Sequence, residues 1–191
     1  MSNFCERRIT VIYFASLVLD AGPNSDQGYE ISSTSLLMHV ASELFHLHVV
    51  TLGRKKYAHA MAKLLDPIGT FFSGRITSRE EAHKGKDGYS KNLDHVSATV
   101  SSVLILDDTP RVWPDHQSNL ITIKRYAYFP HTWQKQQMPV GSSPLETGVD
   151  SDDTLTFILS MLEKVHGDYS LAYQSTRDVD IRSILATRLM P

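Results

Sequence analysis

Apolar residues along this chain fall into short uninterrupted runs and into stretches with helical spacing. The clearest run is residues 103–106, Val-Leu-Ile-Leu, which ends abruptly at Asp107 and Asp108. Four aliphatic residues without polar alternation are typical of a strand buried on both faces, as in a parallel sheet covered by helices. Further runs predict strands at residues 9–19, 47–50 and 120–123, and a short strand at 71–76.

Stretches with apolar residues three or four positions apart predict four helices. Ser33 or Thr34 is expected to cap the first helix. The second follows Gly53, the third begins after residue 152 and ends at His166-Gly167, and the fourth runs over residues 177–189. The inner stripe of the second helix is expected to be Tyr57, Met61, Leu64 and Leu65.

The alternation of strands and helices predicts the fold class. It favours an α/β fold with a doubly wound, mostly parallel sheet and right-handed crossovers. Residues 1–130 are expected to form this α/β domain, and residues 152–191 a helical C-terminal extension. Residues 131–151, rich in Pro, Gln, Gly and Ser, read as a linker, and residues 82–90 as a mobile loop.

Composition adds few constraints. The chain has 191 residues, 41% of them hydrophobic, and a net charge of −2, so no general attraction to nucleic acid or an anionic membrane is expected. The single cysteine, Cys5, cannot form an internal disulfide, which fits a reducing cytosolic or nuclear setting. His46 and His48 are expected to be packing or surface residues because no third ligand lies nearby. Residues 9–19 are too short to span a bilayer.

Polar side chains follow several predicted strands. In an open α/β sheet ligands bind beyond the carboxyl ends of the strands, where Asp107 and Asp108 are expected to lie. Adjacent carboxylates are stable mainly when a cation or a proton offsets their repulsion, and Mg²⁺ is the expected cation. An Asp that starts a turn before Thr109-Pro110, next to a second Asp that points into solvent, remains an alternative. Thr51 and Lys91 also lie at or just before strand ends. A hydroxyl, an ammonium and an acidic pair are the parts that hold a phosphoryl group.

Several motifs in order and spacing give a resemblance to a known family. The motifs are residues 57–67, 74–80, 91–94, 103–109, 112–113, 119–121 and 125–126. Together they resemble the RNA polymerase II C-terminal-domain phosphatases, most closely the plant-type members, within the haloacid-dehalogenase superfamily. The resemblance implies a Mg²⁺-dependent, nuclear protein serine/threonine phosphatase. Its substrate would be the phosphorylated C-terminal domain of RNA polymerase II, and its intermediate an aspartyl-phosphate.

The same resemblance implies roles for individual residues. It implies that Thr51 hydrogen-bonds the phosphoryl oxygens and that Lys91 neutralises them. It further implies that Asp107 and Asp108 hold and orient the metal, and that Arg75 and Arg79 bind the phosphopeptide.

The first motif departs from the family pattern. The family has D-x-D-x-T, in which the first Asp attacks phosphorus and the second is the general acid and base. Here Asp20 matches the nucleophile, or only starts a turn, while Gly22 and Asn24 replace the second Asp and the Thr. Residues 1–34 are therefore divergent or incomplete, and losing a positioned general acid costs about 10²- to 10⁴-fold in rate.

Two functions of different class remain open. One is a weakened phosphatase that uses Asp20, and the other is a catalytically inactive relative that binds phosphopeptide without turnover. A vestigial scaffold is a third reading. Family members often continue into a phosphopeptide-recognition domain, and this chain ends at Pro191, so we also expect weaker recruitment of substrate.

Overall fold

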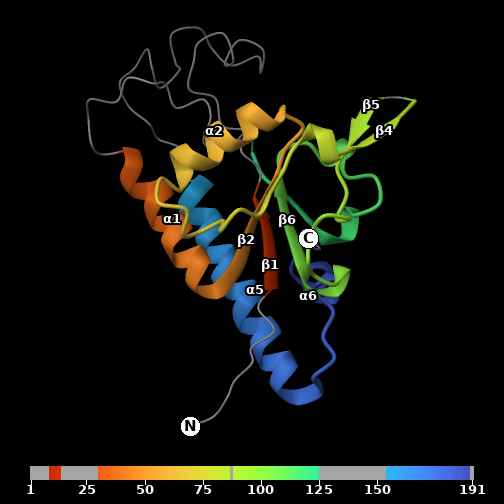
Figure 1. The fold of residues 1–191 in the computed structure, drawn as a ribbon. Helices are drawn as coiled ribbons and strands as arrows, with labels where there is room; N and C mark the ends of the chain where they lie inside the picture. The colour runs from red at the N-terminus through yellow and green to blue at the C-terminus, as the bar shows by residue number, and fades with distance from the viewer. Residues whose placement is uncertain (1–8, 14–29, 87, 125–153, 190–191) are drawn as a thin grey trace, which may run out of the picture.

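A five-stranded parallel sheet forms the centre of the protein (Figure 1). The computed structural model describes residues 9–13, 30–86, 88–124 and 154–189. In it the strands are ordered β3-β2-β1-β6-β7, and every pairing between neighbours is parallel. Parallel strands require crossover connections, which α1 and α2 supply between β1, β2 and β3. The strand bounds are β1 Ile9–Tyr13, β2 Phe45–Val50, β3 Ile76–Thr77, β6 Val103–Asp107 and β7 Leu120–Thr122.

Side-chain alternation along β6 divides the apolar core between the two faces of the sheet. Leu104 and Leu106 join a large cluster with residues of the helices, whereas Val103 and Ile105 join a smaller cluster with Leu93, Val96 and Trp113. Successive strand residues point to opposite faces, so Asp107 shares the face of Ile105. Every residue of β6 is buried, as the uninterrupted apolar run predicts.

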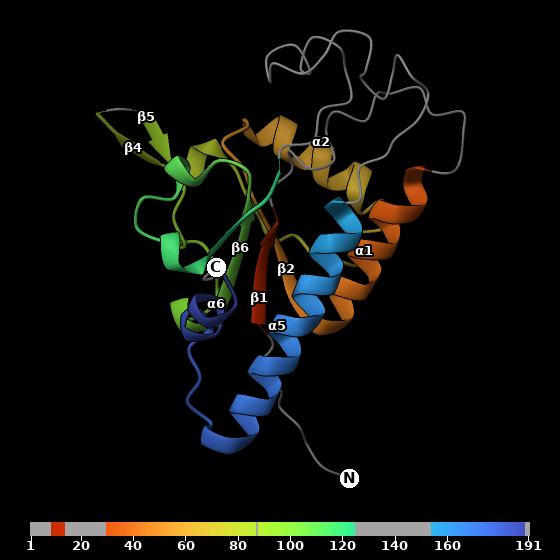
Figure 2. The same cartoon turned by 180° about the vertical axis from the view of Figure 1, so that it is seen from behind.

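Helices cover the face of the larger cluster. In the two opposite views α1 (Glu30–Leu44) and α5 (Thr154–Thr176) run side by side, and they pack directly against each other (Figures 1 and 2). Ile158, Leu162 and Val165 of α5 are fully buried in the same cluster as the strands. Helix α6 (Ile181–Leu189) adds Ile181 and Leu185 to it. The C-terminal helices therefore share one core with the sheet.

Several element boundaries differ from the sequence prediction. Helix α1 begins at Glu30 rather than after Ser33 or Thr34. No helix-breaking residue separates Glu30 from these two positions. Helix α5 continues past His166-Gly167 to Thr176, because it buries Tyr169 in the core, and this outweighs the cost of about 1 kcal/mol for a helical glycine. Of the strand expected over residues 71–76, only Ile76 is in a strand, as the first residue of β3. The expected linker over residues 131–151 lies outside the described residues.

Residues 83–85 and 88–90 pair as an antiparallel hairpin, where a mobile loop was expected. Strand β4 (His83–Gly85) pairs with β5 (Gly88–Ser90), and Gly85 stands opposite Gly88 at the turn. Gly88 has a φ of 120°, a value that glycine adopts without strain. A hairpin this polar gives no hydrophobic alternation, which is why its sequence resembled a loop.

The stripe of α2 (Lys55–Leu65) that was expected to face inward does so only in part, at Leu65. The buried residues are Ala58, Ala62 and Leu65, while Tyr57 is 45% exposed and Leu64 is 69% exposed. Small residues let the helix lie close to the sheet, and the larger side chains then point outward. No helix among the described residues is long and apolar enough to cross a membrane.

Candidate active site at the carboxyl edge of the sheet

Thr51 and Asp107 lie at the same edge of the sheet, on either side of β1. Tyr13 at the end of β1 pairs with Val49 and with Leu106, so the carboxyl ends of β2 and β6 lie at one level. Thr51 follows β2, and Asp107 ends β6. One strand separates them, which corresponds to about 10 Å at the usual spacing between strands. Both side chains are buried.

The carboxylate of Asp107 is the centre of a buried hydrogen-bond network. Its Oδ2 accepts from Lys91 Nζ at 2.6 Å and from Trp113 Nε1 at 2.7 Å. Its Oδ1 accepts from the backbone N–H of Thr109 at 2.8 Å. Asp107 is 0% exposed, and both of its oxygens therefore serve groups of this chain. Sequence reasoning missed the role of Trp113, although the Val-Trp pair was part of the family motif.

Lys91 is a buried ammonium that the protein holds in place from several sides. It is 2% exposed, its backbone N–H donates to the carbonyl of Val112 at 2.7 Å, and its Nζ lies 5.5 Å from the centre of the Trp113 ring. Burial lowers the pKa of Lys91 to about 8, while the nearby carboxylates of Asp107 and Asp108 raise it. The ammonium is therefore largely charged at neutral pH and partly desolvated, which strengthens its attraction for an anion.

Asp108 is only partly buried, in contrast to Asp107. Its Oδ1 accepts a hydrogen bond from the hydroxyl of Thr109 at 2.8 Å. Adjacent residues of a strand end point in different directions, so one acid of the pair faces Lys91 and the other is left nearer the surface. Within the described part of the chain, no three His, Cys, Asp or Glu residues gather in a way that would hold a metal ion.

Thr51 is fixed by the turn that follows it. Its backbone N–H donates to the carbonyl of Thr77 at 2.9 Å, and its hydroxyl oxygen accepts from the N–H of Gly53 at 3.0 Å. A Cβ added at Gly53 would overlap the ring of Tyr57, which lies over this turn. The glycine therefore allows Tyr57 to pack beside Thr51.

The two arginines of the family motif occupy different surroundings. Arg79 donates from Nε to the carbonyl of Leu52 at 2.6 Å, so it lies beside the turn after Thr51. Arg75 donates to the carbonyls of Leu47 and Phe71 at 2.8 and 3.0 Å. Arg79 thus lies next to the Thr51 turn, whereas the guanidinium of Arg75 is hydrogen-bonded to backbone carbonyls in and near β2.

Asp20 and the positions of Gly22 and Asn24 lie outside the described residues. The described strand β1 ends at Tyr13, seven positions before Asp20 in the sequence. The remainder of the strand expected over residues 9–19 is likewise outside the described range. The assignment of Asp20 as the nucleophile therefore stays a prediction from the motif.

A cavity of about 340 Å³ lies beside β2 and β3 and contains a buried histidine. His48 Nε2 lies 2.9 Å from the hydroxyl oxygen of Thr77, and the cavity is also lined by Arg75, His95 and Glu81. Burial, together with the charges of Arg75 and His95, lowers the pKa of His48 from 6.5 to about 4. The ring is consequently neutral at neutral pH.

This histidine predicts a pH dependence of stability. Since its pKa is lower in the folded state, its contribution is complete above about pH 6.5 and is lost as the pH falls toward 4. Between pH 7 and pH 5 the free energy of unfolding should fall by about 2 kcal/mol through His48. Urea unfolding of the wild type and of His48→Gln, which keeps a hydrogen-bonding side chain but does not titrate, measures this. Equal falls in both proteins would contradict the assignment.

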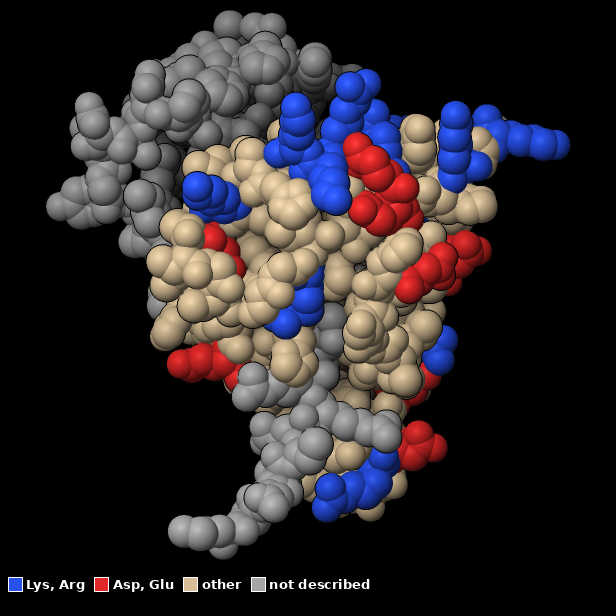
Figure 3. Space-filling view, in the orientation of Figure 1, with Lys and Arg blue, Asp and Glu red and all other residues tan. Residues whose placement is uncertain are grey.

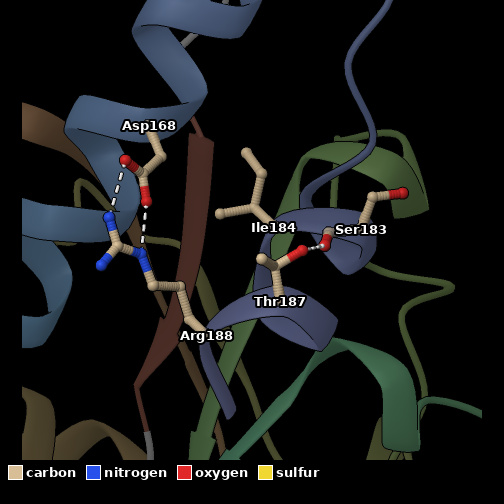
Figure 4. Close-up of a pocket in the computed structure, with 5 residues that line it drawn as sticks. All are labelled: Asp168, Ser183, Ile184, Thr187 and Arg188. Atoms are coloured by element: carbon tan, nitrogen blue, oxygen red, sulfur yellow. Dashed lines mark hydrogen bonds and ion pairs between the residues drawn. The ribbon is translucent and has the colours of Figure 1, made fainter. Parts of the chain in front are cut away.

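Another cavity, of about 500 Å³, lies between α5 and α6 (Figure 4). Its lining includes Asp168 and Arg188, whose side chains form a two-pronged ion pair with distances of 2.7 and 2.9 Å. Helix α6 contacts the short turns that precede β6 and β7, which places this cavity toward the amino edge of the sheet. It is therefore separate from Thr51, Lys91 and Asp107.

Comparison with known families gives this geometry a context. Residues 34–170 match the model of the family described as NLI interacting factor-like phosphatase. The chain belongs to this family. The match covers β2, α2, the hairpin, β6 and most of α5, so Thr51, Lys91 and Asp107 all lie within the matched residues.

Relatives of this chain include plant and animal proteins. The chain is 43% identical over 155 residues to the Arabidopsis thaliana protein RNA polymerase II C-terminal domain phosphatase-like 3, covering 77% of this chain and 12% of that protein. It is 41% identical over 108 residues to a human C-terminal domain phosphatase of RNA polymerase II, covering 56% of this chain and 11% of the human protein. The chain thus spans only a small part of the length of these relatives. The predicted family resemblance is confirmed.

Solved structures confirm the predicted fold class. A structure of the fission yeast RNA polymerase II CTD phosphatase Fcp1-R271A bound to beryllium fluoride matches with a TM-score of 0.61 at 23% sequence identity. The match covers 80% of this chain and 52% of that one. Another Fcp1 structure gives a TM-score of 0.59 at 21% identity. The fold is therefore haloacid-dehalogenase-like, with a helical C-terminal part.

Proposed function

We propose that this chain is a protein serine/threonine phosphatase domain that acts on the phosphorylated C-terminal domain of RNA polymerase II, with weakened turnover. The observation that carries the proposal is the buried Lys91 ammonium, aligned by Asp107 and Trp113 at the same sheet edge as Thr51. The substrate is inferred from relatives whose names state this activity. A nuclear location and the polymerase tail as partner follow from the same inference.

In this proposal the described residues bind and neutralise the phosphoryl group. Thr51 donates its hydroxyl hydrogen to a phosphoryl oxygen, because its oxygen already accepts from Gly53. Lys91 offsets the charge that develops on the phosphoryl oxygens in the transition state. Arg79 lies beside the Thr51 turn and binds the peptide, whereas we assign Arg75 to the support of β2 because its guanidinium serves two backbone carbonyls.

The proposed reaction proceeds through Asp20. Its carboxylate attacks phosphorus, the bond between phosphorus and the serine oxygen breaks, and the serine oxygen takes a proton. Water then hydrolyses the aspartyl-phosphate to release inorganic phosphate and restore the carboxylate. With Gly22 in place of the second Asp, the proton must come from water rather than from a positioned carboxylic acid, which makes the departure of serine slow.

Mg²⁺ fits the donor set at this edge. Mg²⁺ binds through one or two carboxylates and fills its other positions with water and phosphate oxygens, so it does not need a dense cluster of ligands. We propose that Asp108 holds the ion together with Asp20, while Asp107 orients Lys91 because both oxygens of Asp107 already accept hydrogen bonds. When bound, Mg²⁺ supplies positive charge to the phosphoryl oxygens.

The divergent first motif supports a second function. A chain with Thr51, Lys91 and Arg79 but without a working general acid can still bind a phosphoserine peptide. Such a domain would compete with active relatives for the polymerase tail. Gly22 at the expected acid position is the observation that favours this alternative.

Two measurements on the same protein separate these functions. We expect slow hydrolysis of an aryl phosphate with Mg²⁺ that stops with a chelator and falls at least about 10³-fold in Asp20→Asn. Phosphopeptide binding is measured in parallel by fluorescence anisotropy. Binding without any turnover would establish the second function. Turnover that Asp20→Asn leaves unchanged would contradict the proposed nucleophile.

A further inference from the structure

The carboxyl edge of the sheet also carries a basic surface that these functions leave unexplained. Residues 54–91 contain nine Lys or Arg and four Asp or Glu, in a chain whose net charge is −2. Figure 3 shows Lys and Arg side chains gathered in two groups at the top of the molecule, over α2 and over the hairpin, with an acidic group between them. Four exposed residues make up what we call the basic collar: Arg54, Lys56, Lys84 and Lys86.

The chain connects both groups of the collar directly to the phosphoryl site. Helix α2 begins four residues after Thr51, and strand β5 ends at Ser90, immediately before Lys91. The backbone N–H of Arg79 donates to the carbonyl of Gly53 at 2.9 Å, which fastens the segment before the hairpin to the turn after Thr51. The two groups therefore flank the place where we expect the reacting phosphate.

Among the described residues, no acidic side chain forms an ion pair with a cation of the collar. The first turn of α2 contains no acidic residue, and cations there oppose the helix dipole. The neighbouring acids serve other groups, since Glu80 accepts from the backbone N–H of Lys55 at 3.0 Å and Glu81 from the backbone N–H of Ser78 at 2.8 Å. An external anion beside Arg54 and Lys56 would offset the unfavourable placement.

One cation of the hairpin, Lys84, and the nearby Arg79 both lie over the ring of Tyr89. Lys84 Nζ lies 5.9 Å from the centre of the Tyr89 ring, and the guanidinium carbon of Arg79 lies 5.6 Å from it. These contacts reduce the entropy that the Lys84 and Arg79 side chains lose when they bind an anion.

We propose that the basic collar binds negative charges on both sides of the reacting phosphoserine, so that the preferred ligand is a peptide with two or more phosphates. This inference rests on the proposed function, because the collar flanks its phosphoryl site. A peptide fits better than a nucleic acid: Glu80 and Glu81 interrupt the positive surface, and a continuous phosphate backbone would have to cross them.

The test compares the dissociation constants of fluorescent serine peptides that differ only in their number of phosphoserines. The doubly phosphorylated peptide should bind about 5- to 10-fold more tightly than the singly phosphorylated one at low salt. The ratio should shrink as salt rises, because exposed charges are screened. In Arg54→Ala/Lys56→Ala and in Lys84→Ala/Lys86→Ala it should fall below about 2-fold, with binding of the singly phosphorylated peptide nearly unchanged.

A matched control removes two positive charges elsewhere. Lys63→Ala/Lys164→Ala lowers the net charge equally, with one site at the far end of α2 and one on α5, and should keep the full ratio. Equal affinity for both peptides in the wild type, or an equal loss in the control, would overturn the proposal. So would a single-stranded RNA that binds more tightly than the doubly phosphorylated peptide and depends on the same residues.

The same experiments distinguish this inference from the proposed function. A preference for two phosphates without any turnover would support the proposed role of the collar and contradict only the proposed catalysis. Turnover that depends on Asp20, without that preference, would contradict the role of the collar and support the proposed phosphatase activity. Urea unfolding of the α2 variant should show no loss of stability, since removing cations from the first turn relieves the conflict with the helix dipole.

Discussion

Asp107→Ala should destabilise the folded protein by about 3–5 kcal/mol, the usual cost of removing one partner from a buried ion pair. The substitution leaves the buried Lys91 ammonium without the carboxylate of Asp107. It also takes the hydrogen-bond acceptor from Trp113 Nε1 and from the backbone N–H of Thr109. Urea unfolding at neutral pH measures the change, and hydrolysis should disappear because Lys91 is no longer held.

The partner substitution, Lys91→Met, should cost less. Asp107 then keeps two of its three hydrogen-bond donors, and methionine fills the volume of the lysine stem. In the Lys91→Met background, Asp107→Ala should cost about 2 kcal/mol less than in the wild type, since no unpaired ammonium remains. Additive effects would show that Lys91 and Asp107 are not coupled. A double mutant as stable as Lys91→Met would show that the other two hydrogen bonds contribute nothing.

The sequence predicts the position of Asp107 in the fold but not the partners of its carboxylate. A short apolar run that ends in two acids is enough to place Asp107 at the carboxyl end of a buried strand, because that pattern depends only on neighbouring residues. The division of labour between Asp107 and Asp108 depends on Lys91 and Trp113, which are 16 and 6 positions away from Asp107. Pairings of this kind are set by tertiary packing, so the residue types are evident in the sequence but their partners are not.

The helices show the same limit. The apolar spacing in α2 correctly predicts a helix, but it does not determine which set of apolar residues is buried. Packing close to the sheet selects Ala58 and Ala62, and the larger Tyr57 and Leu64 are left exposed. In α5 the burial of Tyr169 carries the helix through Gly167, where local propensity predicts an end. The spacing of apolar residues thus predicts that a helix forms. Which face of the helix is buried and where the helix ends depend on the elements that pack against it.

Gly22→Asp should raise the rate of phosphoserine peptide hydrolysis by about 10²- to 10⁴-fold, the usual contribution of a positioned general acid. In the family pattern this position protonates the leaving oxygen, and Gly22 cannot do so. The gain should be much smaller with an aryl phosphate, because a phenolate leaves without protonation far more readily than a serine alkoxide. Steady-state rates on both substrates, at equal protein and Mg²⁺ concentrations, measure this contrast.

Two further variants decide whether such a gain has the proposed cause. Gly22→Asn has a similar shape but cannot donate a carboxylic proton, and it should leave the rate near that of the wild type. Gly22→Asp combined with Asp20→Asn should be inactive, because a general acid without a nucleophile cannot form the aspartyl-phosphate. If Gly22→Asp gains nothing on the peptide while Asp20→Asn still abolishes aryl phosphate hydrolysis, position 22 does not face the leaving group. In that case another departure of the first motif, such as Asn24 in place of the Thr, limits catalysis rather than the missing carboxyl group.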